Sequence, residues 1–133
     1  RRKIMLEIGM KGKQEVIADE TNSAKTMGSG TLDVFATPAM IALMEKTAWT
    51  SVADELDEGC GTVGISLNVA HSAPTPLGMK VTCESELTEI DGRKLTFHVK
   101  AYDEKGVIGE GTHERFIIQN EKFQKKANMK KDS

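Results

Sequence analysis

Residues 37–56 read TPAMIALMEKTAWTSVADEL, and this stretch decides the fold of the chain. A threonine followed by a proline is typical of a helix start, because Thr suits the N-cap and Pro the first helical position. We expect one long helix that begins at Thr37 and stops near Gly59, where glycine suits the C-terminal cap. At 100° per residue its apolar side chains cover a wide face, which predicts a helix covered by a sheet. That face contains Met40, Ile41, Ala42, Met44, Ala48, Trp49, Val52 and Leu56.

On both sides of this helix the apolar pattern indicates strands. Weak strand character over residues 13–19 precedes the helix. Two-residue alternation follows it, and in residues 62–71 this places Val63, Ile65, Leu67 and Val69 on one face. Asp91-Gly92 and the segment DEKG at 103–106 read as turns, so the last three strands form an antiparallel meander. We expect these later strands over residues 62–71, 79–90, 94–101 and 107–118, and an α+β domain overall.

Length and charge limit the possible functions. With 133 residues the chain fits one domain, 1–133, whose last part, about 122–133, reads as a solvated basic tail. A formal net charge of −2 argues against nucleic-acid binding, which requires a basic surface. The lysines of the tail leave open a contribution to binding a phosphate-bearing ligand.

The location of the protein is predicted from what the sequence lacks. It contains no run of about 18 apolar residues, and its first residues lack the apolar core of a secretory signal. Cys60 and Cys83 form no CxxC pair, so we expect reduced thiols and no zinc site. A cytoplasmic protein that contacts neither membrane nor nucleic acid, and needs no metal, is the resulting expectation.

Three polar residues stand where apolar ones are expected. Glu45 falls within the apolar helix face, where burial of its charge is costly unless a cation or several hydrogen-bond donors compensate. It is either a residue for acid–base chemistry or a structural Glu that extends to the surface or pairs with Lys or Arg. His71 shares the parity of Val69 and so points toward the helix, either as a satisfied core residue or as a base. Thr37 either caps the helix or offers its hydroxyl to a cleft, where the helix N-terminus would also stabilise negative charge.

The last strand carries a further pair. His113 and Arg115 share one face, where Arg115 either joins a structural ion pair or binds a carboxylate or phosphate. His98 alternates to the opposite, solvated face. Together with Gly64 of the first strand after the helix, His113 and Arg115 form our candidate substrate-binding set.

Three segments together carry a family resemblance. They are GSGTLDVFATPAMIALMEKTA, GTVGISLNVAHSAPTPLG and GEGTHERFII, and they resemble the hot-dog thioesterase superfamily, in particular the branch that includes the fluoroacetyl-CoA thioesterase. The resemblance covers residues 5–123, and its most specific signals are ATP…ME and HxAPTPxG in this order. It implies a hot-dog fold, in which a curved antiparallel sheet of about five strands wraps a long helix. It further implies a homodimer or dimer of dimers with active sites at the subunit interface.

The same resemblance assigns roles to residues. The catalytic Thr, Glu and His of the branch fall on Thr37, Glu45 and His71, and a family arginine near the site falls on Arg115. Residues 25–31, KTMGSGT, depart from the pattern, because the fluoroacetyl-specific member has bulky aromatic residues there. We therefore expect a small, general acyl group.

The resulting hypothesis is an acyl-CoA thioesterase without a cofactor, CoA being part of the substrate. His71 would act as a general base on water, or Glu45 would attack the thioester and form an anhydride. Two alternatives stay open. A hydratase or dehydratase of enoyl thioesters would use the same His and carboxylate, and a non-catalytic acyl-CoA sensor or scaffold would bind without turnover.

Overall fold

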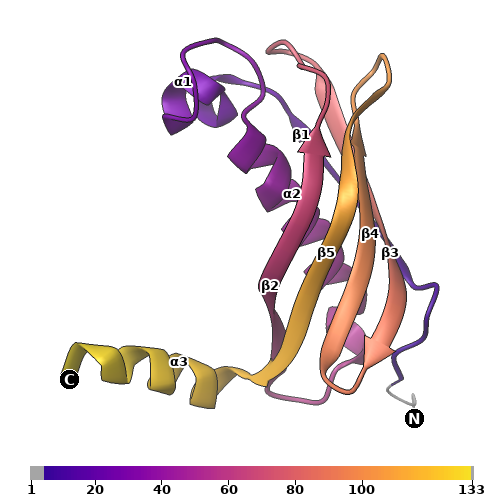
Figure 1. Ribbon diagram of the computed structural model, residues 1–133, viewed down its shortest axis with the longest axis vertical. Helices are drawn as coiled ribbons and strands as arrows, with labels where there is room; N and C mark the ends of the chain where they lie inside the picture. Colours follow the sequence, from indigo (N-terminus) through magenta and orange to yellow (C-terminus); the bar gives the residue numbers. More distant parts are fainter. Residues whose placement is uncertain (1–4, 133) are drawn as a thin grey trace.

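A computed structural model describes residues 5–132; its strands and long helix follow the order that the sequence predicts, and shorter helices that were not predicted are also present. Residues 1–4 and Ser133 of the predicted domain lie outside the described part. One strand precedes a long helix, and four strands follow it in an α+β fold (Figure 1). The elements are β1 (Lys11–Ile17), α1 (Ala24–Met27), α2 (Thr37–Val52), β2 (Cys60–His71), β3 (Lys80–Asp91), β4 (Lys94–Tyr102), β5 (Val107–Gln119) and α3 (Asn120–Asn128).

The five strands form one antiparallel sheet in the order β1-β3-β4-β5-β2. The sheet curves around α2, which runs along one of its faces (Figure 1). This is the hot-dog arrangement that the resemblance implies. The meander of β3, β4 and β5 is confirmed, and β2 returns beside β5 as an edge strand. Glycine permits the turn between β3 and β4, since Gly92 has a φ of 62°.

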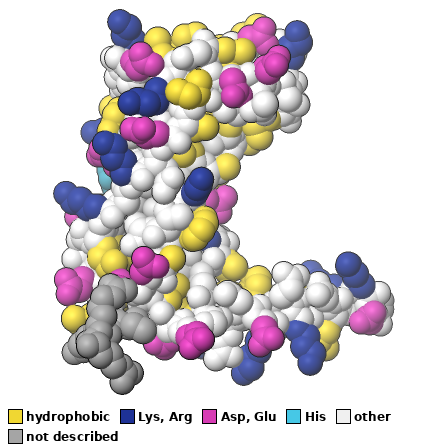
Figure 2. All heavy atoms as spheres, turned by 180° about the vertical axis from the view of Figure 1, so that it is seen from behind, with side chains coloured by type: hydrophobic (Ala, Val, Ile, Leu, Met, Phe, Trp, Pro, Cys, Tyr) yellow, Lys and Arg dark blue, Asp and Glu magenta, His cyan; other side chains and the backbone are white. Residues whose placement is uncertain are grey.

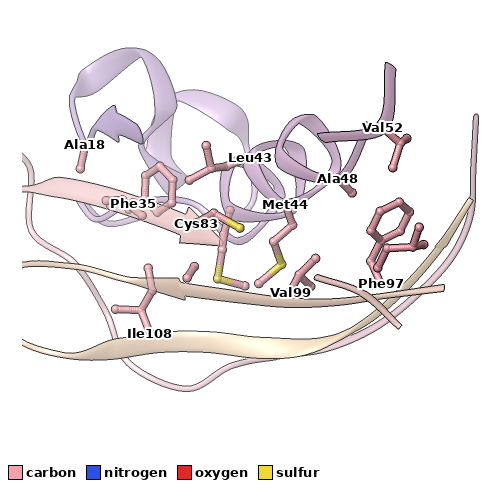
Figure 3. Packing of buried hydrophobic residues seen from close by; sticks show 14 of the residues in the cluster. Ala18, Phe35, Leu43, Met44, Ala48, Val52, Cys83, Phe97, Val99 and Ile108 are labelled. Atoms are coloured by element: carbon pink, nitrogen blue, oxygen red, sulfur yellow. The ribbon is translucent and has the colours of Figure 1, made fainter. Parts of the chain in front are cut away.

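The core lies between α2 and the concave face of the sheet (Figure 3). The predicted inward positions of β4 are confirmed, because Leu95, Phe97, Val99 and Ala101 are all fully buried. The buried face of α2 is narrower than expected. It consists of Met40, Leu43, Met44, Thr47, Ala48 and Val52.

The prediction that the whole apolar face of α2 packs in the core is therefore partly wrong. Trp49 is 44% exposed and Ala42 is exposed, because both lie on the side of α2 away from its buried face. An exposed tryptophan indicates a surface that another molecule can cover.

A β-bulge corrects the predicted faces of β2. The register with β5 shifts between Gly64 and Ser66, so Ile65 is the extra residue. Val63 pairs with Phe116 on the outer face, whereas Leu67 pairs with the buried His113 on the inner face. The prediction that Val63 and Leu67 share a face is therefore wrong. The bulge leaves the prediction for His71 intact, since that residue follows Leu67 at even spacing.

The basic tail is helical rather than irregular. α3 begins directly after β5 and projects away from the sheet beyond its β2 edge (Figure 1). The amide N–H of Asn120 donates to the carbonyl of Gly59 at 2.9 Å, which fixes the start of α3 beside the start of β2. Within residues 5–132, no helix has the length and apolar character needed to cross a membrane.

Candidate active site

Thr37 and His71 form a hydrogen-bonded pair between the start of α2 and the end of β2. Thr37 Oγ1 lies 2.7 Å from Nδ1 of His71. The expected capping role of Thr37 is wrong, because Ala36 occupies the N-cap and no side chain caps the helix there. Pro38 stands in the first turn, at the second helical position rather than at the predicted first one. With no capping bond to make, the hydroxyl of Thr37 is available to the imidazole.

The surroundings of His71 favour its neutral form. Burial of the half-exposed ring lowers the pKa of His71 below the ordinary value of 6.5. Its Nε2 atom is buried and has no hydrogen-bond partner among residues 5–132. A neutral imidazole with one nitrogen on a hydroxyl is the state in which histidine can accept a proton.

A cavity of about 290 Å³ opens beside this pair. The start of α2 and the segment after His71 form one wall, and the loop before α2 forms the other. Such a volume is at the lower end of the range for ligand sites, so it suits a small organic group. Besides the pair itself, the cavity is lined by Ala24, Ser29, Val34, Phe35, Ser72, Ala73 and Pro74.

Glu45 lies further along α2 and forms a second, separate site. Its side chain is 39% exposed, and Oε2 lies 3.4 Å from Nη1 of Arg115. Of the alternatives open at the sequence level, the ion pair is therefore the one observed. Gly64 lies directly against the carboxylate, since a Cβ at that position would be 2.6 Å from Oε2. Only glycine leaves room there for Glu45 in its observed position.

A buried network holds Arg115 against Glu45. Arg115 is 5% exposed; its Nε donates to Oγ1 of Thr62 at 2.8 Å, and its Nη2 donates to the Thr62 carbonyl at 2.9 Å. His113 is fully buried, and its Nδ1 donates to the carbonyl of Ser66 at 2.8 Å. Nε2 of His113 is then an acceptor for Nη1 of Arg115 at 3.1 Å.

This network shows what His113 and Arg115, two members of the candidate substrate-binding set, contact in the structure. Burial lowers the pKa of His113 and of Arg115, and the charge of Arg115 lowers that of His113 further. His113 is thus a neutral acceptor that orients a cation. The donors of Arg115 point at Thr62, His113 and Glu45, so the arginine positions the carboxylate. The sequence analysis did not identify Thr62 or Ser66. Thr62 takes part in the network through its backbone carbonyl as well as its hydroxyl, and Ser66 takes part through its backbone carbonyl alone. Backbone contacts cannot be recognised from residue types.

The structure brings two of the three predicted catalytic residues together. Glu45 follows Thr37 by eight residues on α2, which corresponds to about 12 Å along the axis. Among residues 5–132, no hydrogen bond or ion pair joins Glu45 to either Thr37 or His71. One chain therefore presents two separate half-sites, the Thr37–His71 pair and the Glu45–Arg115 pair.

His98, the third histidine, belongs to neither half-site. His98 lies on the outer face and contacts Glu110 at 2.7 Å, with both side chains about half exposed, as its alternation predicted. No group of three or more His, Cys, Asp or Glu side chains within the described chain is arranged to hold a metal ion.

Comparison with known proteins gives a consistent family assignment. A family model, fluoroacetyl-CoA-specific thioesterase, matches residues 18–121. The fluoroacetyl-CoA thioesterase of Streptantibioticus cattleyicolor is 43% identical over 98 residues, which cover 74% of this chain and 70% of that protein. The solved structure of the fluoroacetyl-CoA thioesterase FlK has a TM-score of 0.90 at 32% identity and covers 95% of this chain and 98% of that one. A hypothetical protein of Thermus thermophilus, a thioesterase superfamily member, has a TM-score of 0.87 at 25% identity, with coverages of 99% and 96%.

Proposed function

Because the chain belongs to the fluoroacetyl-CoA-specific thioesterase family, we propose that it is an acyl-CoA thioesterase that hydrolyses a small acyl-CoA to the free acid and CoA. The observation that carries this proposal is the 2.7 Å contact between Thr37 and His71 beside a cavity of about 290 Å³. Variants of FlK have been solved with acetyl-CoA and with fluoroacetate and CoA, so related sites accept both parts of such a substrate.

In the first route, neutral His71 takes a proton from water, and the hydroxide equivalent attacks the thioester carbonyl. The C–S bond then breaks, and the CoA thiolate leaves with the proton returned by the imidazole. Thr37 and the first-turn N–H groups of α2 stabilise the negative charge that develops on the carbonyl oxygen. The hydrogen bond between Thr37 and His71 supports this route because it fixes the ring at the helix start.

In the second route, Glu45 attacks the thioester itself and forms a mixed anhydride, which water then hydrolyses. The ion pair with Arg115 supports this route, because it holds the carboxylate in a defined position. Trapping of an acyl group on Glu45 during a single turnover distinguishes the two. A trapped acyl-Glu45, or label from water in the carboxylate of Glu45, supports the anhydride, and absence of any acyl-enzyme supports direct attack by water; label in the product acid is expected from both routes.

A homodimer completes the site in this proposal. The edge strand β2 exposes Ile65 (50%) and Leu67 (36%), and α2 exposes Trp49 (44%). A long apolar edge is suited to pairing with an identical strand, and a two-fold axis makes that pair antiparallel. The Cys60 end of one strand then lies beside the His71 end of the other. Glu45 of one copy thereby approaches the partner's Thr37–His71 pair.

The proposal includes a small acyl group and a cytoplasmic location. The cavity beside Thr37 is bounded by the short side chains of Ser29 and Ala73 and contains no large aromatic side chain apart from the buried Phe35. This supports a small acyl group without selection for fluorine. The location is supported by Cys60 and Cys83, which are both free thiols, as in proteins of reducing compartments.

The test is release of free CoA thiol from short, branched, aromatic and long acyl-CoAs. The intact protein should act on the short substrates, and His71→Ala and Glu45→Ala should each lose at least about a hundredfold in kcat while remaining folded. His98→Ala is the matched control, since that histidine lies on the outer face. A thiol assay that stays silent, with the thioester bound, would contradict the proposal and favour the hydratase or the sensor.

A further inference from the structure

A groove of about 280 Å³ lies where α3 leaves the sheet, apart from both half-sites. One side is the outer face of β5 with the turn before β4, and the other is the first two turns of α3. The side chains that matter here are Arg93, Phe116, Lys122, Phe123 and Lys126.

The charge of this groove is of one sign. Three cations line it, Arg93, Lys122 and Lys126, and no carboxylate does. A hollow of about 570 Å³ on the outer face of β1 and β3 differs, because its lysines are accompanied by Glu84 and Glu86. The α3 groove is therefore suited to an anion, whereas the positive and negative side chains of the other hollow balance each other.

The basic character extends along α3. Residues 120–132 contain five lysines against one Glu and one Asp, a formal +3 in a chain of net −2, so the rest of the chain carries −5. Figure 2 shows Lys side chains along the projecting arm, away from the body of the molecule. This concentration of charge attracts a polyanion to one end of the molecule.

The groove also offers flat apolar surfaces. The guanidinium carbon of Arg93 lies 5.7 Å from the centroid of the Phe116 ring, and Phe123 is 46% exposed beside it. Aromatic rings and arginine planes are the surfaces on which nucleobases stack. Cations together with exposed rings suit a phosphorylated nucleotide better than inorganic phosphate.

The position of the groove relates it to the reaction. Gln119, at the end of β5, pairs with Cys60 at the start of β2. Gly64, which contacts Glu45, is four residues further along, or about 13 Å. The groove and the Glu45 half-site therefore share one end of the β2–β5 pair, on opposite faces of the sheet. The long pantetheine arm of CoA, passing around this end of the strand pair, would span that separation.

We propose that this groove binds the phosphorylated nucleotide end of the acyl-CoA, with Arg93, Lys122 and Lys126 on the phosphates and Phe123 against the adenine. This inference rests on the proposed thioesterase function. It assigns to α3 the recognition of CoA, separate from the acyl group.

The test compares two substrates that share an acyl group, the acyl-CoA and the acyl thioester of N-acetylcysteamine, which lacks the nucleotide. In the double variant Lys122→Ala/Lys126→Ala, KM for the acyl-CoA should rise roughly tenfold or more, with kcat unchanged. KM for the N-acetylcysteamine thioester should not change. The matched control is Lys125→Ala/Lys130→Ala. It removes the same charge from the arm, but at two residues that do not line the groove.

Several outcomes would overturn the inference. One is an equal rise of KM in the two double variants, and another is an equal effect on both substrates. A free nucleotide that binds the groove as tightly as CoA without competing with the acyl-CoA would assign the groove to another ligand. If the intact protein hydrolyses neither thioester, the proposed function fails, and calorimetry with adenosine 3′,5′-bisphosphate still tests the groove. Binding that is lost only in Lys122→Ala/Lys126→Ala supports it, and absence of binding refutes it.

Discussion

Thr37 Oγ1 lies 2.7 Å from Nδ1 of His71, although the two residues are 34 positions apart in the chain. This contact joins the start of the central helix to the end of the edge strand. It is possible because Ala36, not Thr37, occupies the N-cap of α2. The hydroxyl thus contacts the imidazole instead of capping the helix, and variants of Thr37 and His71 test the chemical role of each residue.

Removal of the Thr37 hydroxyl should reduce catalysis with little effect on folding. In Thr37→Val we expect kcat to fall by about a hundredfold, because a donor near the developing charge is lost. The free energy of unfolding should change by less than about 1 kcal/mol, because Thr37 is exposed. Thr37→Ser retains the hydroxyl and should keep most of the activity. Steady-state kinetics and urea unfolding check both, and equal losses in Val and Ser variants would contradict the hydroxyl's role.

The pH dependence of kcat/KM should follow His71. Burial lowers the pKa of His71 below 6.5, and the neutral ring is the active form. Activity should therefore be complete at neutral pH and fall only as pH drops through the lowered pKa, giving an acid limb with a midpoint below 6.5. The midpoint is read from kcat/KM between acid and neutral pH. A midpoint clearly above 6.5 would mean that another group controls the rate.

The buried network around Arg115 should be structurally important. Arg115→Met removes the partners of Thr62 and His113 and leaves their acceptors unpaired at a nearly buried site. We expect a loss of roughly 2–4 kcal/mol in the free energy of unfolding, measured with urea. The exposed pair of His98 and Glu110 is the comparison, and His98→Gln should cost less than about 1 kcal/mol. Equal costs would show that the network adds nothing beyond a surface contact.

Much of this architecture is predictable from the sequence. The alternation of Leu95, Phe97, Val99 and Ala101 predicted an inward face, and these residues are buried because one strand face must pack on α2. The helix start at Thr37-Pro38 was equally visible. Glu45 was recognisable because a carboxylate interrupts an apolar helix face.

Other features depend on contacts that local patterns do not contain. The bulge at Ile65 depends on pairing with β5, and strict alternation from Val63 could not reveal it. Trp49 fitted an apolar helix face, but the sheet of one chain does not extend over it. The roles of Thr62 and Ser66 depend on where Arg115 and His113 reach across the sheet.

Gly64→Ala tests the closeness of the strand to the carboxylate. A Cβ there would be 2.6 Å from Oε2 of Glu45, which is the end of a flexible side chain and can move. We therefore expect a folded protein with a displaced Glu45 and a kcat reduced by about tenfold or more. Unfolding by urea and CoA release measure the two effects. Unchanged kcat would show that the observed position of Glu45 is unimportant for the reaction.

The central claim is that each active centre uses Glu45 of one copy with Thr37 and His71 of the other. The most direct measurement is CoA release by a heterodimer, purified with two different tags, of Glu45→Ala and His71→Ala subunits. One of its two centres contains both intact residues, so the heterodimer should regain about half of the wild-type kcat although each parent is inactive. A heterodimer as inactive as its parents would contradict the shared centre.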